Sequence, residues 1–486
     1  MSTTLSSAKE VGFVINAKSY LITLDGLPSV RLNDILINDD GHRALVVLLE
    51  KDHIVATILD NILPKTGDRY YKCEEGLMFS LGNHLFGRVI NALGVSVDGK
   101  GSLPQHTTQL QFDVVATGID TREEITEQFE TGVALVDALF PIGKGQRQLL
   151  FGPTSSGKTT FIRDIILNQK GKDVVWIYTT VGKPVSFLER FASGIYAHGA
   201  DAYTIIVAAL AEDPTPMVSL APTVGLLIAE HFERQGKEVL LILDDLSTHA
   251  KYLRETALLM GRIPGRQSYP GDIFYQHAHL LERAGNFNKK AGGGSITVLP
   301  VIETDMENFT DLIPTNLMAT TDGHLFFSQA LRAQGAYPSI AVDRSVTRVG
   351  RQTQRVLQKE LSTRIMALLA DYNRQKDYIK FGTNVSTKTQ DVIKQGEIAH
   401  ELLKQDPSQN IEVHLQSALL GLTFVPFLLN RDISFVRTFK GKIVDTLRDN
   451  PQLEGLRESS KKATTLGEFL EVLNRSSHIL EKECQQ

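Results

Sequence analysis

The feature that most constrains this chain is an eight-residue run in which two glycines frame four other residues and lead into lysine and threonine. The run consists of Gly152, Pro153, Thr154, Ser155, Ser156, Gly157, Lys158 and Thr159, and Thr160 follows it. The spacing is that of a phosphate-binding loop, because glycines let backbone N–H groups curl around phosphate oxygens. Residues 148–151 predict a strand and residues 158–168 a helix, which is the context that such a loop requires.

The side chains of this run suit a nucleoside triphosphate. Lys158 places a positive charge toward the β- and γ-phosphates, and the Thr159 hydroxyl is a ligand for Mg²⁺. Thr160 lies in the same first helical turn, whose positive dipole end favours an anion. We therefore expect residues 152–160 to bind ATP or ADP with Mg²⁺ and disfavour a fortuitous glycine-rich turn.

A second motif is the apolar run of residues 239–243, which ends in Asp244 and Asp245. A buried strand that ends in an acid is the usual second half of a phosphate-loop site, so Asp244 is predicted to hold Mg²⁺ through water. The alternative is that one of the two acids caps the next helix.

The strand expected at residues 173–178 is followed by Gly182 and Lys183, at a position where hydrolases of this kind carry a group that orients the attacking water. A lysine is a cation at neutral pH and cannot act as that base. Glu189 is near in sequence but lies in a helix-like run. The sequence therefore predicts ATP binding with poor hydrolysis, whether Lys183 has a positive role or is an ordinary surface lysine.

Arg348 follows a strand expected at residues 340–342. An arginine beyond a sheet strand can reach the γ-phosphate on a neighbouring subunit, as an arginine finger does. The alternative is a solvated charged helix face, since Arg344, Arg351 and Arg355 lie nearby at helix-like spacing.

The remaining pattern divides the chain into three parts. Short β-rich runs that indicate a small barrel lie at residues 19–23, 43–49 and 53–59. Apolar runs typical of a covered parallel sheet lie at residues 173–178, 203–209, 238–243 and 295–302. Helical periodicity follows at residues 357–372, 411–429, 433–448 and 466–482. We predict a multidomain fold: a β-barrel at 1–79, an α/β P-loop (RecA-like) domain at 80–356 and an α-helical bundle at 357–486.

Composition excludes several classes of protein. The formal net charge is −5, which argues against a nucleic-acid coat or a polybasic membrane binder. Cys73 and Cys484 are the only cysteines, so neither a disulfide framework nor a cysteine-based zinc site is expected. The sequence holds no uncharged apolar stretch of about 18 residues and no signal-peptide core, so we expect membrane contact only through partners.

With these residues in place, the chain resembles the α (non-catalytic) subunit of F-type ATP synthases over about residues 18–405, and more weakly to its end. The matching stretches include LFGRV, ETGVALVDALFPIGKGQRQLLFGPTSSGKT, LDDLS, PGRQSYPGD, GGGSITVLPVIET, IPTN and SVTRVG. They lie at residues 85–89, 130–159, 243–247, 264–272, 292–304, 313–316 and 345–350.

The resemblance implies an alternating ring of three α-type and three catalytic β-type subunits around a γ-type central stalk. It implies that Arg348 is the finger given to the partner's catalytic site, and that residues 152–159 with Asp244 form a non-catalytic Mg-nucleotide site. Residues 264–272, which two Pro-Gly breaks mark as a stiff surface loop, match the sleeve that faces the stalk. The implied location is the cytoplasmic inner face of a bacterial cell membrane, reached through the complex.

The chain also departs from the family pattern. The middle of the loop, residues 153–156, differs from the usual D-R-Q-T, and Lys183 replaces a glutamine. Three residues expected around the adenine are changed, while Gln405 remains; the changed ones are Arg332, Tyr337 and Pro407. Few residues precede the barrel, so the helix that binds the peripheral stalk is expected to be reduced. These departures suggest a divergent α paralogue from an alternative rotary complex.

Three interpretations follow. The first is a ring subunit that completes a partner's catalytic site. The second is a self-sufficient homohexameric ATPase, a secretion motor or RNA helicase, which predicts a glutamate at position 183 and, for the helicase, a basic or aromatic RNA surface. The third is a ring scaffold with degenerate nucleotide binding, which the intact Lys158, Thr159 and Asp244 disfavour.

Overall fold

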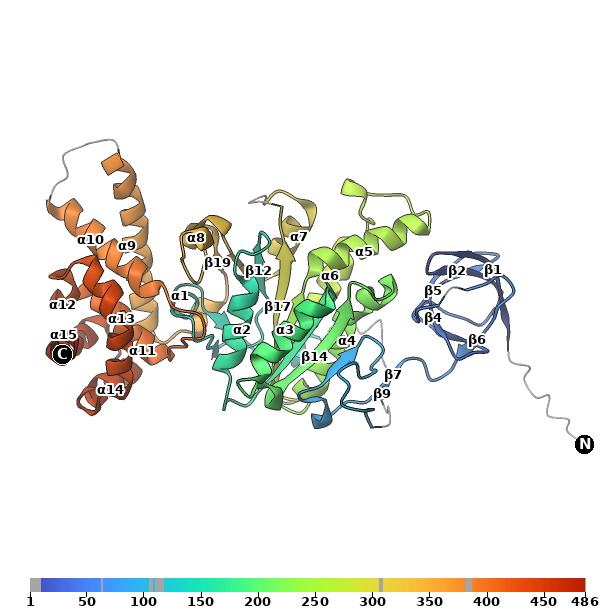
Figure 1. Cartoon of the computed structure of the whole chain (residues 1–486), viewed down its shortest axis with the longest axis horizontal. Helices are drawn as coiled ribbons and strands as arrows, with labels where there is room; N and C mark the ends of the chain where they lie inside the picture. The colour runs from blue at the N-terminus through green and yellow to red at the C-terminus, as the bar shows by residue number, and fades with distance from the viewer. Residues whose placement is uncertain are drawn as a thin grey trace, which may run out of the picture. The chain divides into compact units, whose positions relative to one another are not determined.

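The structure is a computed structural model that describes residues 10–62, 64–104, 108–109, 118–305, 309–380 and 387–485. Its contacts divide the chain into two compact units. Unit 1 comprises Met1–Glu123, Gly171–Thr304 and Asn308–Thr321, and unit 2 comprises Glu124–Lys170, Asp305–Glu307 and Asp322–Gln486. Each unit is described by itself, with elements labelled as in Figure 1. The three-domain limits at residues 79 and 356 stay a prediction.

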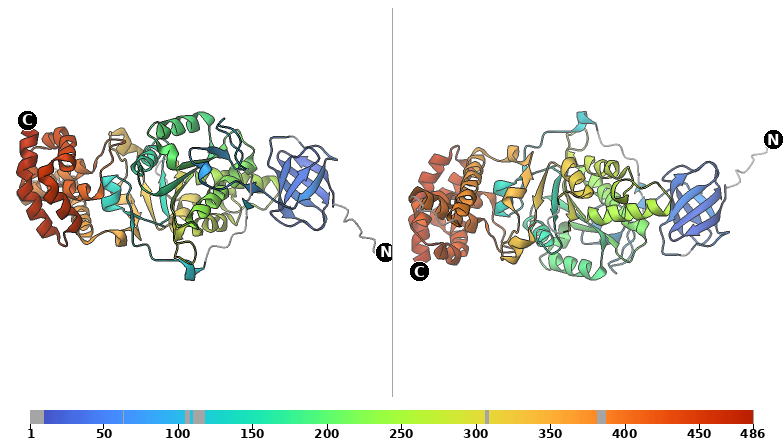
Figure 2. Two further views of the ribbon diagram at one scale, coloured as in Figure 1. Left: turned by 90° about the horizontal axis from the view of Figure 1, so that it is seen from below. Right: turned by 90° about the horizontal axis from the view of Figure 1, so that it is seen from above.

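Unit 1 begins with a closed barrel, drawn in blue in Figure 2, whose strand order is β1-β2-β5-β4-β3-β6. The strands are β1 (Gly12–Lys18), β2 (Leu21–Gly26), β3 (Ile35–Asn38), β4 (Arg43–Leu49), β5 (Ile54–Ile58) and β6 (Arg69–Cys73). All neighbours are antiparallel, and β6 pairs with both β3 and β1. Their apolar side chains fill the interior, among them Val14, Ile22, Leu24, Leu36 and Val46. The barrel predicted from the short β-rich runs is confirmed.

The rest of unit 1 is built on parallel strands in the order β17-β15-β13-β14-β8. They are β8 (Val89–Asn91), β13 (Val174–Lys183), β14 (Thr204–Leu210), β15 (Glu238–Asp244) and β17 (Ser295–Glu303). The first eight residues of β13 are all buried, as expected for strands covered on both faces. The helices of this part are α3 (Val185–Tyr196), α4 (Thr215–Glu233), α5 (Leu246–Leu259), α6 (Ile273–Glu282) and α7 (Leu312–Thr320). The predicted α/β architecture is therefore correct.

Unit 2 contains the strand, loop and helix that the sequence predicts. Strand β12 (Gln148–Gly152) is parallel to β18 (Gly323–Phe326), which pairs antiparallel with β19 (Val346–Thr347). Helix α2 (Lys158–Asn168) follows the loop after β12, and α1 (Ala134–Leu139) precedes it in the chain. The helical region, orange to red in Figure 1, confirms the predicted C-terminal helices. They are α9 (Val356–Lys380), α10 (Thr387–Leu403), α11 (Val413–Gly421), α12 (Pro426–Leu429), α13 (Ile433–Asp449), α14 (Glu454–Lys462) and α15 (Leu466–Gln485).

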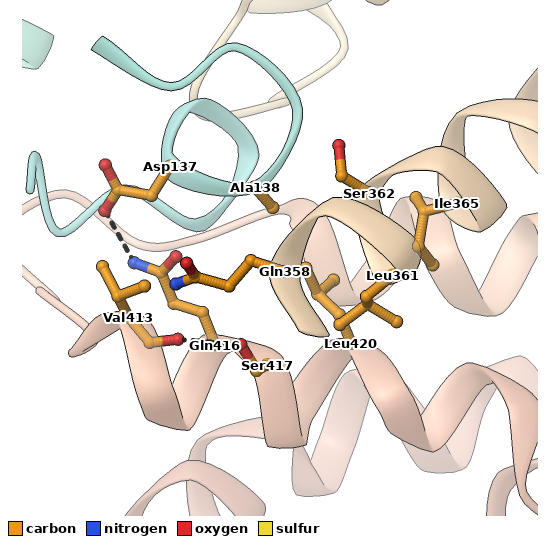
Figure 3. Close-up of a pocket in the computed structure, with 10 residues that line it drawn as sticks. All are labelled: Asp137, Ala138, Gln358, Leu361, Ser362, Ile365, Val413, Gln416, Ser417 and Leu420. Atoms are coloured by element: carbon orange, nitrogen blue, oxygen red, sulfur yellow. Dashed lines mark hydrogen bonds between the residues drawn. The ribbon is translucent and has the colours of Figure 1, made fainter. Parts of the chain in front are cut away.

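A buried carboxylate links α1 to the helical region, as Figure 3 shows. Asp137 accepts hydrogen bonds of 2.8 Å from the Thr131 N–H and hydroxyl, the Gly132 N–H and the Gln416 side chain. Burial raises the pKa of Asp137 to about 6, and these donors oppose the rise. A cavity of about 10 Å³ beside it, lined by α1, α9 and α11, has room for one water. Sequence patterns gave no signal for this residue.

Two expectations around Arg348 are wrong. Residues 340–342 do not form a strand, because Ile340 makes only an isolated bridge to Phe327 and a 3₁₀ turn begins at Val342. Pro338 lies just before and has no N–H with which to extend a ladder. The helix-like spacing of the nearby arginines is also misleading. Residues 344–355 contain 3₁₀ turns and the short strand β19, with no α-helix before α9.

Two further points concern membranes and the N-terminus. None of the described helices has both the length and the apolar character needed to cross a bilayer. The expected shortening of the N-terminal segment falls on residues 1–9, which lie outside the described residues.

Two buried histidines pack together between α5 and α6 of unit 1. His249 Nδ1 lies 3.3 Å from His277 Nε2, and His249 Nε2 lies 3.2 Å from the Ser219 carbonyl oxygen. Burial lowers the pKa of His249 to about 4. Burial, together with the neighbouring His249, lowers the pKa of His277 to about 3. Both imidazoles are therefore neutral in the folded protein at neutral pH.

We predict that this pair makes folding sensitive to mild acid. Below pH of about 6.5 an unfolded histidine takes up a proton that the folded protein excludes, so the free energy of unfolding falls as pH drops from about 6.5 toward 4. Each histidine contributes a slope of up to about 1.4 kcal/mol per pH unit. Urea unfolding at pH 7, 6 and 5 should show a shallower acid loss for His277→Leu than for the wild type. The exposed His478→Leu is the control; equal slopes for all three proteins would contradict the prediction.

Candidate nucleotide-binding site

The loop between β12 and α2 has the backbone of a phosphate cradle. Gly152 and Gly157 have φ of 153° and 107°, and Ser155 between them has φ of 61°. A Cβ on Gly152 would lie 2.2 Å from the Phe327 carbonyl oxygen, and one on Gly157 would lie 2.8 Å from Ser339 Oγ. Any side chain at either position would therefore clash with a neighbouring atom. The positive φ angles also favour glycine at both positions.

The loop and the first turn of α2 carry Lys158 and several hydroxyl side chains. Lys158 is 6% exposed, and its ammonium donates to the carbonyl oxygens of Gly152 at 2.7 Å and Pro153 at 2.8 Å. Helix α2 begins at Lys158, so its first N–H groups belong to the loop. Thr159 and Thr160 lie in its first turn, half-buried. The buried Ser156 hydroxyl has no hydrogen-bond partner within the described residues, a deficit that a bound anion can satisfy.

Gln405, predicted as a nucleotide contact, supports the segment before α1. It is buried, and its side chain accepts from the Ala134 N–H at 2.9 Å and donates to the Gly132 carbonyl oxygen at 2.8 Å. Its own N–H donates to the Tyr337 carbonyl oxygen at 2.7 Å. Its contact with a nucleotide stays a prediction, while Pro407, two residues later, is exposed.

Tyr337 takes part in a buried polar pair that the sequence did not reveal. Its hydroxyl donates to Asp164 on α2. Burial raises the pKa of both groups, and the Tyr337 hydroxyl opposes the rise at Asp164. The Arg332 guanidinium lies 6.0 Å from the centre of the Tyr337 ring. Tyr337, one of the residues that depart from the family pattern, therefore ties the segment after β18 to the helix of the phosphate loop.

Lys183, at the end of β13 in unit 1, is not an ordinary surface lysine. Its side chain is 15% exposed, and its Nζ lies 3.1 Å from both Asp244 Oδ1 and Asp245 Oδ2 and 3.5 Å from Glu303 Oε1. Burial pulls the pKa of Lys183 down, but the three carboxylates outweigh it, and the pKa lies above its usual value. The reading as a plain surface residue is wrong, because strand pairing places β13 beside β15 and therefore Lys183 beside both acids.

Asp244 and Asp245 both accept hydrogen bonds from neighbouring residues. Asp245 caps α5, because its Oδ1 accepts from the Thr248 N–H at 2.5 Å and the Ser247 hydroxyl at 2.7 Å, so the capping alternative holds for this acid. Asp244 is 2% exposed, and its Oδ2 accepts from the Tyr178 hydroxyl at 2.6 Å. Burial raises the pKa of Asp244, whereas Lys183 and the cap outweigh burial and lower that of Asp245.

These surroundings do not fit direct binding of Mg²⁺ by Asp244. One of its oxygens faces an ammonium and the other accepts a phenol hydrogen, so a metal bound directly to Asp244 would lie close to the positive charge of Lys183. The role through water stays a prediction. Nowhere in the described parts of the chain do three His, Cys, Asp or Glu side chains gather as a metal-binding group. Thr159, the other predicted ligand, belongs to unit 2 and lies in the first turn of α2.

Arg348 is placed by an edge strand. It follows β19, which pairs with β18 through Thr347 and Gly323, and its N–H donates to the Asp322 carbonyl oxygen at 2.9 Å. The residue is exposed, and its charge helps to lower the pKa of His324, after the larger effect of burial. The loop at residues 264–272 is exposed except for Tyr269 and Pro270. It has the irregular backbone that its proline and glycine residues predict, with Gln267 and Ser268 at φ of 53° and 61°.

Comparison with known proteins shows the family. Residues 132–347 match the nucleotide-binding domain of the ATP synthase alpha/beta family, and residues 354–473 match the C-terminal domain of the ATP synthase alpha/beta chain. The chain therefore belongs to the ATP synthase alpha/beta family.

Three similar proteins indicate which type of subunit within the family this chain resembles. ATP synthase subunit alpha 1 of Mycoplasmopsis pulmonis is 38% identical over 461 residues, which cover 94% of this chain and 87% of the relative. ATP synthase subunit alpha of Metamycoplasma arthritidis is 39% identical over 82% of this chain and 75% of the relative. ATP synthase subunit alpha of Macrococcus caseolyticus is 34% identical over 97% of this chain and 94% of the relative. The resemblance to alpha subunits found in the sequence is confirmed.

We predict that Lys158→Ala lowers the affinity for ATP at least about tenfold, because the loop loses the cation that faces its phosphates. Fluorescent nucleotide titration of the purified chain measures the effect. Lys170→Ala, which removes an exposed lysine just beyond the same helix, is the control and should leave the affinity within about twofold. Equal affinities of wild type and Lys158→Ala would contradict the predicted role of the loop.

Proposed function

We propose that this chain is a non-catalytic, nucleotide-binding α-type subunit of a rotary ATP synthase or ATPase. In this proposal β-type partners alternate with it in a ring of three plus three around a γ-type central stalk. Membership of the alpha/beta family and the similarity to named alpha subunits support the proposal. The complex reaches the inner face of the membrane through its other subunits.

The main support for the non-catalytic role is that Lys183 is a largely buried, charged lysine paired with acids. A base that orients water must be able to accept a proton, whereas this ammonium is held between Asp244 and Asp245 with a raised pKa. Tyr178 cannot replace it, since burial and the charge of Asp244 raise the pKa of its phenol well above the usual value. The interpretation as a self-sufficient homohexameric motor requires a carboxylate at position 183 and is disfavoured.

The nucleotide, ATP or ADP, is proposed to bind the loop at residues 152–160. The positive-φ backbone, the buried Lys158 and the unsatisfied Ser156 hydroxyl support this site and disfavour a degenerate scaffold. When bound there, Mg²⁺ would offset phosphate charge, and Thr159 is the ligand that the loop supplies. Asp244 and Gln405 remain predicted members of the site on sequence grounds.

Arg348 is proposed to act outside its own chain. Its exposed position beyond an edge strand suits a guanidinium that stabilises negative charge on a phosphoryl group held by a β-type partner. Rotation of the stalk would then change catalysis by moving this guanidinium relative to the partner's nucleotide.

We predict that the purified chain binds ATP but does not turn it over. Its own site lacks a base, so phosphate release should stay at the background of a Lys158→Ala preparation. A coupled phosphate assay at saturating ATP measures this. Sustained release by the wild type that Lys158→Ala abolishes would overturn the non-catalytic assignment.

We predict that Arg348→Ala leaves assembly of the ring intact and reduces its ATP turnover at least about 10³-fold, the lower range for a missing arginine finger. Arg351→Ala, which removes another exposed arginine three residues later, is the matched control and should retain activity. The test uses the complex purified with its copurifying chains, with assembly checked by gel filtration. Full turnover in Arg348→Ala would exclude the finger.

A further inference from the structure

A short helix of unit 2 places an arginine beside the phosphate loop of the same unit. Helix α8 (Gln329–Ala333), labelled in Figure 1, follows β18, and the Ser328 side chain caps it. Ser328 donates its N–H to the Ser339 carbonyl oxygen at 2.8 Å, and the Ser339 hydroxyl donates to the carbonyl oxygen of Ser156 in the loop. The segment that contains Arg332 is therefore connected to the loop by hydrogen bonds.

The aliphatic part of the Arg332 side chain lies close to the second glycine of the loop. A Cβ on Gly157 would lie 4.0 Å from Arg332 Cδ, which is ordinary van der Waals distance. Gly157 directly precedes α2, whose first N–H groups lack partners within the helix and favour an anion. The guanidinium extends beyond Cδ, so it is close enough to contact an anion that the loop holds.

The charge of Arg332 has no counter-ion within the described residues. The residue is exposed, and its guanidinium takes part in no ion pair or hydrogen bond there. It lies 6.0 Å from the centre of the Tyr337 ring, whose hydroxyl stays protonated because burial and the charge of Asp164 raise its pKa. Asp164 itself lies 3.7 Å from Arg163 Nε. An uncompensated guanidinium at this place stabilises negative charge bound to the loop.

The other cation of the loop is already bonded to the loop itself. Lys158 donates to the carbonyl oxygens of Gly152 and Pro153. The Ser156 hydroxyl, which is 1% exposed, has no partner within the described residues. Two polar groups, this hydroxyl and the Arg332 guanidinium, therefore gain a partner when an anion binds.

We propose that Arg332 is a second cation of the phosphate loop, and that its guanidinium binds the phosphates of the nucleotide and not its base. The inference rests on the proposed nucleotide binding and adds a residue that determines how strongly the site selects for phosphate charge. A planar guanidinium has five N–H donors in a fork that matches two phosphate oxygens.

The first experiment separates the charge of this side chain from its flat shape. ATP titrations of the purified chain compare Arg332→Gln, Arg332→Phe and Arg332→Lys with the wild type. We expect about tenfold weaker binding for Gln and Phe, because both lose the charge, and a loss within about threefold for Lys, which keeps it. Arg475→Gln removes an exposed arginine of α15 that lies 3.6 Å from Glu471, and this control should bind within about twofold of the wild type.

Each other result of these titrations has a definite meaning. Wild-type affinity in Arg332→Gln would overturn the inference, and wild-type affinity in Arg332→Phe would overturn it in favour of stacking on the base. Equal losses in all three variants would show that the charge does not matter and would also overturn it. Absence of ATP binding by the wild type would instead overturn the proposed function.

The second experiment measures the salt dependence of ATP affinity for the wild type and Arg332→Gln. A contact between charges is screened by added salt, so the affinity of the wild type should fall more steeply with NaCl concentration than that of the variant. Equal slopes would contradict the inference even if the variant binds more weakly. Because Arg332 is exposed, the melting temperature of the variant should stay within about 2 °C of the wild type, which shows that the comparison is made between folded proteins.

Discussion

The central constraint in this protein is that a buried charge must be met by an opposite charge or by several donors. Lys183 meets it with the carboxylates at the ends of β15 and β17, and those contacts fix the end of β13. Asp137 meets it with four donors, one of them from α11, and thereby joins the helical region to α1. Both buried charges lie where elements distant in sequence meet. The ion pairs and hydrogen bonds that neutralise these charges therefore also hold those elements together.

Much of this architecture is predictable from local pattern. The barrel strands, the doubly buried strands and the helix after the phosphate loop are confirmed because each depends on a hydrophobic period or a turn signal carried by neighbouring residues. The predictions that are wrong concern residues whose surroundings depend on contacts with residues distant in sequence. Lys183 looks like a surface lysine until β13 is paired with β15, and residues 344–355 show helical spacing but are held by β18 and by 3₁₀ turns. Asp164 and Asp137 gave no signal, since Tyr337, which donates to Asp164, and Gln416, which donates to Asp137, lie more than one hundred residues away along the chain.

Residues that depart from the family pattern also take part in packing within this structure. Tyr337 is paired with Asp164 through its hydroxyl, so a change near the expected base-binding residues also adds a link between α2 and the segment after β18. Gln405, the retained residue, is bonded to the segment before α1 and to Tyr337. Substitutions at these positions therefore alter packing as well as any contact with a nucleotide, and the two effects have to be separated by measuring stability alongside affinity.

The closed barrel has a consequence for how such a chain can associate. Because β6 pairs with both β1 and β3, each of the six described barrel strands has two neighbours and none of them is a free edge strand. Another polypeptide cannot extend this sheet by adding a strand. Contacts made by this part of the molecule must therefore rely on side chains and loops, and the barrel offers no edge strand for edge-to-edge aggregation.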